Sequence, residues 1–533
     1  ANLAPAAAGL RPRASPGQVC TSRPRALPHA GRTVDSADPS RNLNELQKPL
    51  EHFRAKTKRL KVHPAEMTVL WVVAAHLVLL PWAFGAMDAG TQIASFTLAL
   101  LGFVLALLPR HYTEEHTGSA SFRLLTFPKL IKFPIFWLGL ALLGLVLMQG
   151  LNPAWSRATD GTVWWVVPKA HTAWLPVGVE VPFADWGPWR MLLIYAAVWL
   201  TVCTVWVAFT RRRTVQILLT VLAFNGLLLA LFGIAQRLLG NGKIFWLVES
   251  PNTAFFSTFF YKNHAGAYLD LTLAVSCGLA AWYYLRGLRR LEKSNPGGVF
   301  AFFATCIAVG VLTSYARGAT LVMLGFLLAA IGGFVVHQIR TPSENRKPIV
   351  VIVLVLIFGY FLKTGFEALR SREAWDRLKA GVMREDLSLE FRERTTQAAR
   401  EMLGEQWQRG VGAGSFRFVF PIYQHRHPEL VRHQGRPMFW EHAHNDVVQT
   451  PIELGLAGTL LLLAGLGWYL FALVRSYFWE NALSASVVLG LVLLAAYSWW
   501  DFPFQCPAIL LTWFVLWTAI TLWTQFEEMN LKG

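Results

Sequence analysis

The chain has 533 residues, of which 54% are hydrophobic and 15% are charged, and its formal net charge is +17. Soluble domains carry about a quarter charged residues, so this composition excludes an ordinary soluble fold. The positive charge would suggest nucleic-acid binding in a soluble chain, but much of it lies in the N-terminal segment and in short loops beside apolar blocks. We attribute it to membrane topology and anionic lipids, and we expect no nucleic-acid partner.

Residues 1–66 differ in composition from the rest of the chain. They are rich in Ala, Pro and Arg, contain no long apolar run, and precede the first methionine, Met67. Because a signal peptide needs an apolar run, this segment is not one. We expect a basic, disordered segment on the cytoplasmic side. The position of Met67 raises the alternative that residues 1–66 precede the natural start.

Long apolar blocks fill most of the remaining sequence. Each is about 20 residues long, which is the length that crosses the hydrocarbon core as a helix. Backbone groups in lipid must be hydrogen-bonded within the segment, so such blocks form helices. We therefore predict an all-α polytopic membrane protein with about twelve transmembrane helices. The predicted spans are residues 68–87, 91–109, 133–151, 189–210, 214–237, 265–285, 299–315, 318–338, 348–364, 454–474, 483–501 and 507–525.

Basic residues in the short loops predict the orientation of these helices. Arg211, Arg212 and Arg213 follow the fourth span, and further basic residues follow the sixth, eighth and tenth. With twelve spans, these loops share one face with both termini, and we predict that this face is cytoplasmic. The predicted parts are the segment 1–66, nine spans within 67–364, a large and mainly helical periplasmic loop at 365–443, and three spans with a short tail within 444–533.

Polar clusters are predicted to gather at the opposite, outer face, whereas ionisable residues inside the spans are few. The exceptions are Asp270 in the sixth span and Glu453 at the mouth of the tenth. Ion-coupled transporters place such groups near the midplane, so the pattern favours an enzyme at the outer leaflet, with a membrane transporter as the alternative. The four clusters are residues 261–264, 314–318, 410–417 and 441–446.

Two cations in these clusters are candidates for substrate contact. Arg317 lies between two strongly apolar blocks with almost no loop, and a charge at that depth is costly unless it is paired or functional. Lys262 precedes the sixth span, where its side chain could also extend to the interface without any further role.

Histidines and glycines in the other two clusters each allow two interpretations. His442 and His444 form a His-x-His pair, which suits either zinc ligation or general base catalysis. Zinc needs a third ligand at a defined spacing, which the irregular upstream stretch does not supply, so we favour a base. The glycine-rich run 410–417 could cradle phosphate, but it lacks the Lys-Ser/Thr of a P-loop, so we favour a plain turn.

Four motifs follow one another between residues 190 and 475. His444-Asn445, nine residues, and then Gly455 and Gly458 form the pattern His-Asn-x9-Gly-x-x-Gly. The string SYARGA contains Arg317, and FFYKNHAGAYL precedes the sixth span. The fourth motif is FRERTTQAAREMLGEQWQRGVGAGSFRFVFPIYQ in the large loop. In chain order, with FFYKNHAGAYL first, SYARGA second, the large-loop motif third and the His-Asn motif last, they resemble the bacterial O-antigen ligase and polymerase superfamily.

The resemblance implies a metal-independent glycosyltransferase without a cofactor. Such enzymes take a glycan from undecaprenyl diphosphate at the periplasmic face of the bacterial inner membrane. Ligases pass it to a hydroxyl of lipid A-core, whereas related members polymerise repeat units or glycosylate proteins. We expect an O-antigen ligase, with an O-antigen or exopolysaccharide polymerase as the nearest alternative. The expected partners are the donor lipid, lipid A-core or another glycan acceptor, and membrane lipids.

The residue types fit this chemistry. A diphosphate is already a good leaving group, so stabilisation of its charge matters more than an acid. We expect Arg317 to contact the diphosphate and His444 to deprotonate or orient the acceptor hydroxyl, which attacks the anomeric carbon with inversion. Asn445 is expected either to orient the reacting groups or to cap the following helix. The expected substrate-binding residues are Lys262, Asn263, His264, Arg392, Arg394, Arg417, His442 and Asn445.

Overall fold

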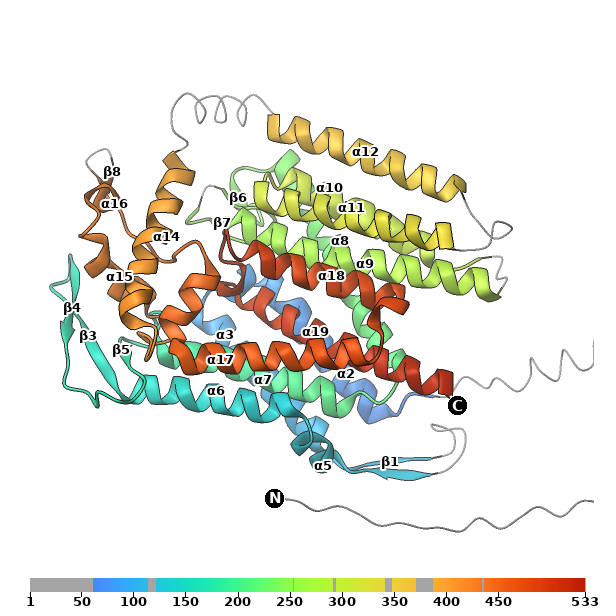
Figure 1. The fold of residues 1–533 in the computed structure, drawn as a ribbon, viewed down its shortest axis with the longest axis horizontal. Helices are drawn as coiled ribbons and strands as arrows, with labels where there is room; N and C mark the ends of the chain where they lie inside the picture. The colour runs from blue at the N-terminus through green and yellow to red at the C-terminus, as the bar shows by residue number, and fades with distance from the viewer. Residues whose placement is uncertain are drawn as a thin grey trace, which may run out of the picture. The chain divides into compact units, whose positions relative to one another are not determined.

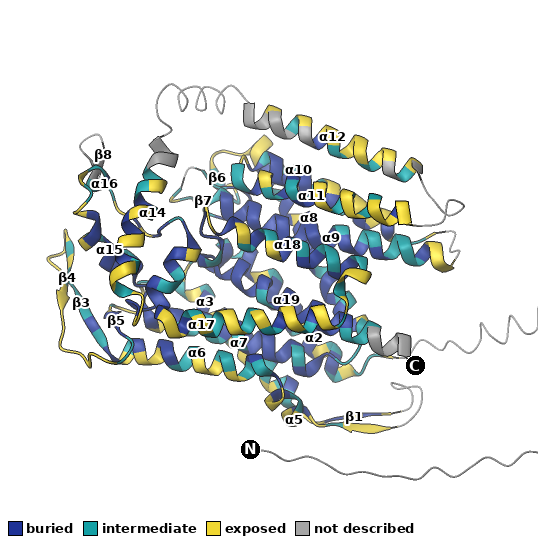
Figure 2. Cartoon of the chain, in the orientation of Figure 1, coloured by how far each residue is buried: buried dark blue, intermediate teal, exposed yellow. Residues whose placement is uncertain are grey.

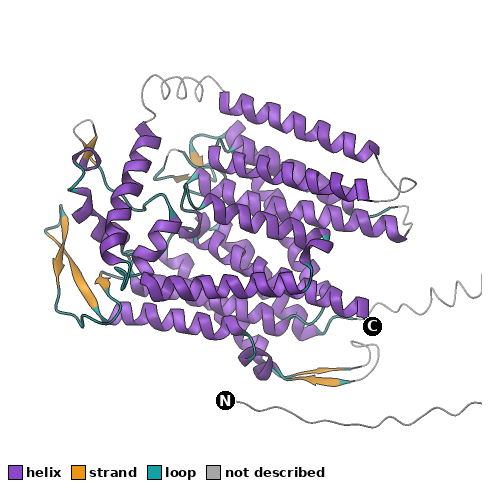
Figure 3. Cartoon of the chain, viewed as in Figure 1, coloured by secondary structure: helices purple, strands orange, loops and turns teal. Residues whose placement is uncertain are grey.

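The computed structural model describes residues 61–113, 121–252, 254–290, 294–340, 348–370, 387–433 and 436–532. Helices dominate this part of the chain, with a few short strands at its edges (Figures 1 and 3), which confirms the predicted fold class. Most of segment 1–66, and residues 371–386 of the predicted large loop, lie outside the described residues.

Each predicted span coincides with a helix. Within the described ranges, nine of these helices are long and apolar enough to cross a membrane, whereas the apolar parts of α10, α12 and α18 are shorter. The multi-pass character is therefore supported, but the count of twelve spans is not confirmed. The helices are α2 (Pro64–Trp82), α3 (Ala89–Leu107), α6 (Pro134–Leu151), α7 (Pro188–Ala208), α8 (Arg212–Leu239), α9 (Lys262–Arg290), α10 (Gly297–Thr313), α11 (Arg317–Arg340), α12 (Pro348–Arg370), α17 (Asp446–Arg475), α18 (Ala482–Tyr497) and α19 (Pro507–Lys532).

The boundary predicted after residue 66 lies inside α2. Proline at the first helical position and the His63 side chain, which accepts a hydrogen bond from the Ala65 amide at 3.1 Å, start the helix earlier. Glu66 is buried and accepts hydrogen bonds from the Tyr112, Thr210 and Thr214 hydroxyls. Residues 64–66 are thus part of the folded helical bundle rather than of a disordered segment.

The basic turn between α7 and α8 lies at the end of the bundle where α9 and α19 finish. The Arg212 guanidinium lies 5.2 Å from the ring centroids of both Trp282 and Trp523 and forms an ion pair with Glu527. These contacts bring the turn between α7 and α8 to the C-terminal parts of α9 and α19. The same end carries α5 (Thr126–Ile131) and the hairpin of β1 (Arg110–Tyr112) and β2 (Phe122–Leu124) (Figure 1).

The larger connecting segments gather at the opposite end, on the left in Figure 1. A three-stranded sheet that the sequence did not predict has the order β4-β3-β5, with β3 antiparallel to β4 and parallel to β5. The described part of the large loop is mainly helical, as expected. The elements are β3 (Pro153–Thr159), β4 (Trp164–Pro168), β5 (Gly178–Glu180), β6 (Lys243–Ile244), β7 (Val248–Glu249), α14 (Leu387–Gln406), α15 (Phe416–Gln424), α16 (Pro428–Val431), β8 (Arg432–His433) and β9 (Arg436–Pro437).

Burial divides the helices into an interior set and a peripheral set (Figure 2). α9 and α19 are buried along most of their length, whereas α17 exposes a stripe that includes Leu460, Leu463 and Phe471. Exposed apolar stripes of this length suit contact with lipid chains. A separate, smaller core joins α14, α15 and the first turns of α17 to Val179 of β5. This second core fixes the loop elements to the bundle and positions the site described next.

Candidate functional site

A cavity of about 520 Å³ lies where the N-terminal ends of α9 and α17 meet the turn before α19. We call it the histidine cavity because three imidazoles line it. Its size lies within the range of about 300–1,000 Å³ typical of small-ligand sites. It is lined by Phe84, Met87, Pro251, Asn252, Phe259, Phe260, Tyr261, His264, Met438, Phe439, Trp440, Glu441, His442, His444 and Phe502.

The Phe502 ring is the centre of an aromatic cluster in this cavity. Its centroid lies 4.6 Å from that of His442, 4.8 Å from that of His444 and 5.1 Å from that of His264. Tyr261 stacks on it at 5.4 Å. Phe502 therefore fixes the mutual positions of three histidines that come from two distant parts of the chain.

His444 has a strained backbone conformation that places its side chain in the cavity. Its φ is +54°, in the left-handed region that non-glycine residues rarely adopt and that is enriched at functional sites. The conformation is fixed on both sides, since the Ala443 amide donates to Gln449 at 3.0 Å and Asn445 caps α17 by accepting from the Val448 amide at 3.1 Å. The structure thus shows that Asn445 is the helix cap.

The surroundings of His444 keep its imidazole in the neutral form. Burial, assisted by the positive charge of Arg392 and opposed by Asp501, lowers its pKa to about 4. The ring is consequently neutral at pH 7. Its Nδ1 is buried and has no hydrogen-bond partner among the described residues.

His442, in contrast, is held by protein contacts. Its Nδ1 lies 3.3 Å from the Gln449 side-chain amide, and its Nε2 lies 3.5 Å from Arg417. Burial and the charge of Arg417 lower the pKa of His442 well below its usual value. Over the described ranges, no three His, Cys, Asp or Glu side chains are grouped so as to hold a metal ion. The contacts with Gln449 and Arg417 fix the orientation of the His442 ring.

Arg392 is the cation that the structure places next to this cluster. Its guanidinium donates to the Tyr261 hydroxyl at 3.0 Å. Burial alone would lower its pKa, but Tyr261 and Asp501 offset that effect and leave the pKa raised. Asn263 also donates to the Tyr261 hydroxyl, at 2.8 Å, and to Asp501. A charged guanidinium, a hydroxyl and a carboxylate thus form one connected layer beside the histidines.

Arg317 lies at the same end of the bundle but is not among the residues that line the cavity. It begins α11 directly after the turn in which Tyr315 has a φ of +54°. Its neighbour Gly318 packs on the Tyr497 ring, and the Tyr497 hydroxyl donates to Asp501 at 2.6 Å. Gly318, next to Arg317, thus packs against the Asp501 layer, so Arg317 and His444 lie at the same end of the bundle.

The other predicted cations are distributed around the cavity. Lys262 opens α9, and its backbone amide donates to Ala254 at 2.9 Å. Arg394 lies on α14 at 3.5 Å from Glu429, and neither it nor Lys262 lines the cavity. Arg417 borders it through His442.

The glycine-rich run 410–417 is a structural turn. Its amides are used within the protein, since Gly414 and Phe416 donate to the Glu453 carboxylate at 3.0 and 3.3 Å and Ala413 donates to Gln149 at 3.0 Å. Amides that are already occupied cannot cradle a phosphate. The turn instead clamps the large loop to α17.

Part of the sequence matches a known protein family. Residues 300–463 match the family model described as O-Antigen ligase. This region, about a third of the chain, is similar to the O-antigen ligase family, and we call it the ligase domain. This confirms the superfamily that the four motifs indicated, which consists of membrane glycosyltransferases of the ligase and polymerase type. A search of curated proteins finds no match.

The ligase domain contains His444, Arg317 and Arg392. The cavity-lining residues Tyr261, His264 and Phe502 lie outside it. Phe502 and Asp501, in the turn between α18 and α19, were not predicted from the sequence. The only signal there is an Asp-Phe-Pro-Phe string between two apolar blocks, which does not reveal that the turn folds back onto His444.

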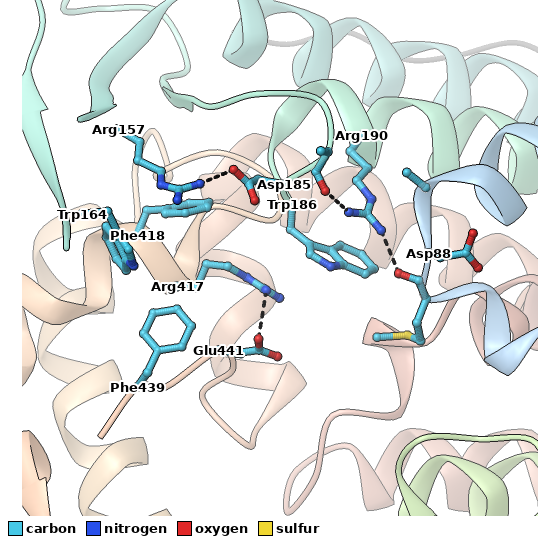
Figure 4. Close-up of a pocket in the computed structure, with 13 residues that line it drawn as sticks. Asp88, Arg157, Trp164, Asp185, Trp186, Arg190, Arg417, Phe418, Phe439 and Glu441 are labelled. Atoms are coloured by element: carbon cyan, nitrogen blue, oxygen red, sulfur yellow. Dashed lines mark hydrogen bonds and ion pairs between the residues drawn. The ribbon is translucent and has the colours of Figure 1, made fainter. Parts of the chain in front are cut away.

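A second cavity, of about 530 Å³, adjoins the histidine cavity (Figure 4). Met87, Phe439 and Glu441 line both. We call it the arginine–tryptophan cavity, since Arg157, Arg190 and Arg417 surround Trp164 and Trp186 within it. Most of its wall comes from segments that precede the ligase domain.

Proposed function

We propose that this protein transfers a glycan from undecaprenyl diphosphate to an acceptor hydroxyl, and that it acts as an O-antigen ligase on lipid A-core. The observation that carries the proposal is the neutral His444 imidazole, which faces a cavity with a charged guanidinium beside it. We further propose that this end of the bundle faces the periplasm across the bacterial inner membrane, with both termini in the cytoplasm. The basic turn between α7 and α8 at the opposite end supports this orientation.

The proposed step is a single displacement. His444 takes the proton of the acceptor hydroxyl as that oxygen forms a bond to the anomeric carbon. The bond between that carbon and the diphosphate oxygen breaks, and the diphosphate leaves with the electron pair. The attack comes from the opposite side, so the configuration inverts. The proton then passes from His444 to solvent or to the released diphosphate.

Guanidinium groups stabilise the charge of the leaving diphosphate in this proposal. Arg392 is held beside the histidines, and Arg317 and Lys262 begin helices at the same end of the bundle. Arginine offers two parallel hydrogen bonds to a phosphate, so neither a metal ion nor a cofactor is part of the proposed mechanism. Asn263, His264, Arg394 and Arg417 remain proposed contacts of the glycan or of its phosphates.

The distribution of polar groups supports an enzyme over a transporter. The connected layer of Tyr261, Asn263, Arg392 and Asp501 lies at the ends of helices, whereas a transport path needs ionisable groups deeper in the bundle. Asp270 is a buried carboxylate within α9 that has no hydrogen-bond partner among the described residues, so it does not belong to a polar path.

The test is reconstitution of the full chain in vesicles with undecaprenyl-diphosphate glycan and either lipid A-core or a second donor molecule as acceptor. We expect transfer in the presence of a chelator, and a rate lower by about 100-fold or more in His444→Gln. Arg317→Ala should also lower the rate strongly. The exposed His171, replaced by Gln, is the matched control.

The products of this assay separate the two reactions of the family. Glycan on lipid A-core identifies a ligase, whereas elongation of the donor-linked glycan identifies a polymerase. A His444→Gln variant that keeps the wild-type rate would overturn the proposed base. Loss of transfer in the chelated sample would overturn metal independence.

A further inference from the structure

The arginine–tryptophan cavity has a composition distinct from that of the histidine cavity. Three guanidiniums, of Arg157, Arg190 and Arg417, face three carboxylates, of Asp88, Asp185 and Glu441. The formal charge of its lining is therefore zero. A diphosphate would gain nothing from a site with balanced charge, because each carboxylate would oppose the attraction of a guanidinium.

Most of these charged groups are fixed in orientation by the protein. Arg190 is buried, and each of its three guanidinium nitrogens donates one hydrogen bond, to Gln92 and to the Ala184 and Met87 carbonyls, at 2.6 to 2.7 Å. Arg157 forms an ion pair with Asp185, and its Nε is buried without a partner among the described residues. Donors and acceptors thus alternate along the wall, as Figure 4 shows.

Aromatic rings form the other part of the wall. Trp164 meets Phe418 and Phe439 edge to face, with centroids 5.6 and 5.7 Å apart. The Trp186 ring is covered by the guanidiniums of Arg190 and Arg417, at 4.5 and 5.5 Å. The Arg157 guanidinium lies farther from the Trp164 ring, at 5.9 Å, so Trp164 and the half-exposed Phe439 are the least covered aromatic rings of this wall.

Arg417 joins the two cavities. Its guanidinium lies 3.4 Å from the Glu441 carboxylate in the arginine–tryptophan cavity and 3.5 Å from His442 in the histidine cavity. A ligand that extends from one cavity to the other would pass this residue and reach the imidazole of His444.

We propose that the arginine–tryptophan cavity binds uncharged sugar residues of a substrate whose reacting end lies in the histidine cavity. Pyranose rings carry apolar C–H faces that stack on aromatic rings, and their hydroxyls both donate and accept hydrogen bonds. The least covered aromatic rings and the alternating donors and acceptors match both features. The proposal rests on the proposed glycan transfer and assigns sugar selection to residues 157–190, which precede the ligase domain.

Binding to the full chain in lipid nanodiscs tests this proposal without measuring catalysis. The probes are the oligosaccharide released from the donor lipid, core oligosaccharide without lipid A, and undecaprenyl diphosphate without a glycan. We expect Trp164→Leu and Asp185→Asn each to weaken oligosaccharide binding by about ten-fold. The matched controls are Trp174→Leu, which alters a side chain 80% exposed on the same segment, and Glu180→Gln in an exposed ion pair.

The pattern across probes identifies the sugar source and can refute the site. Weakened binding of the donor oligosaccharide assigns the cavity to the donor, and weakened binding of the core oligosaccharide assigns it to the acceptor. Unchanged binding of both in the two cavity variants overturns the proposal, as does weakened binding of the glycan-free diphosphate. Asp185→Asn preserves side-chain shape, so an unaltered melting temperature excludes misfolding as the cause.

Failure of the proposed function gives a different pattern. His444→Ala should abolish transfer and leave oligosaccharide binding unchanged, since His444 lies outside this cavity. Oligosaccharide binding that depends on Trp164, in a protein that transfers no glycan, would refute the transferase and retain the sugar site.

Discussion

Replacing Arg392 by Gln should move the pH dependence of transfer in a direction that the structure fixes. In the wild-type protein, burial and the Arg392 charge together lower the pKa of His444 to about 4. The base works in its neutral form, so its activity is lost only when the pH falls through that pKa. Removing the positive charge removes one of the two effects that disfavour the protonated imidazole, and the pKa must rise.

The size of the effect can be worked out from these values. At pH 7, a pKa of about 4 leaves about one imidazole in a thousand protonated, whereas the ordinary value of 6.5 leaves about a quarter protonated. The wild-type kcat/KM should therefore be flat from neutral pH down to about pH 5. A charge several ångströms away, in a medium of effective dielectric constant about 20, contributes on the order of one pH unit. The acid limb of Arg392→Gln should thus appear near pH 5.

Initial rates at low donor concentration, measured between pH 4.5 and pH 8, would show this shift. The plateau should also fall in Arg392→Gln if the guanidinium contacts the diphosphate, but the position of the limb is independent of the plateau height. Arg400→Gln on the same helix is the control, since Arg400 is exposed and should leave both unchanged. A wild-type limb near pH 6.5, or a limb in Arg392→Gln that does not move, would refute the neutral-base argument.

Three further outcomes follow from the same contacts. Phe502→Leu should reduce transfer by about ten-fold by releasing the stacked histidines, while Trp500→Leu, at a side chain 69% exposed in the same turn, should not. Gly455→Ala should lower the melting temperature, because its φ is +66° and a Cβ would lie 2.7 Å from the Arg409 backbone, whereas Gly467→Ala has open space and should not. Lowering the pH from 7 to 5 should reduce the free energy of unfolding by about 2 kcal/mol through His444, because its imidazole is protonated in the unfolded chain but stays neutral in the folded chain. Thermal unfolding of His444→Gln should show a smaller loss over the same pH range.

The helices could be predicted from the sequence because apolar blocks of about 20 residues have few alternatives to a membrane-spanning helix. The ends were less accurate, as at α2, where Pro64 and His63 start the helix before the predicted boundary. The three-stranded sheet was missed because β4 pairs with β3 at the edge of the bundle, and its tryptophans follow no clear alternation. The local pattern of apolar residues predicts which segments face lipid, but it does not predict which two loop segments pair as strands.

The site shows the same limit. His444 and Arg392 were proposed from residue type and motif, and both lie beside the histidine cavity. Phe502, which holds the histidines, was missed because its role depends on a contact across 58 residues of sequence from His444. Arg317 stays a predicted contact of the diphosphate: it begins α11 at the same end of the bundle and is not among the residues that line the histidine cavity.

The spacing of the His-Asn-x9-Gly-x-x-Gly motif has a geometric explanation in this structure. Asn445, Gln449 and Glu453 are four residues apart and lie on one face of the first turns of α17. Asn445 caps the helix, Gln449 contacts His442 and donates to Glu453 at 3.0 Å, and Glu453 binds the glycine-rich turn. Gly455 then breaks the helix. One residue more or fewer would rotate this face by about 100° and separate the histidines from the turn that fixes the loop, so the motif length sets the position of His444.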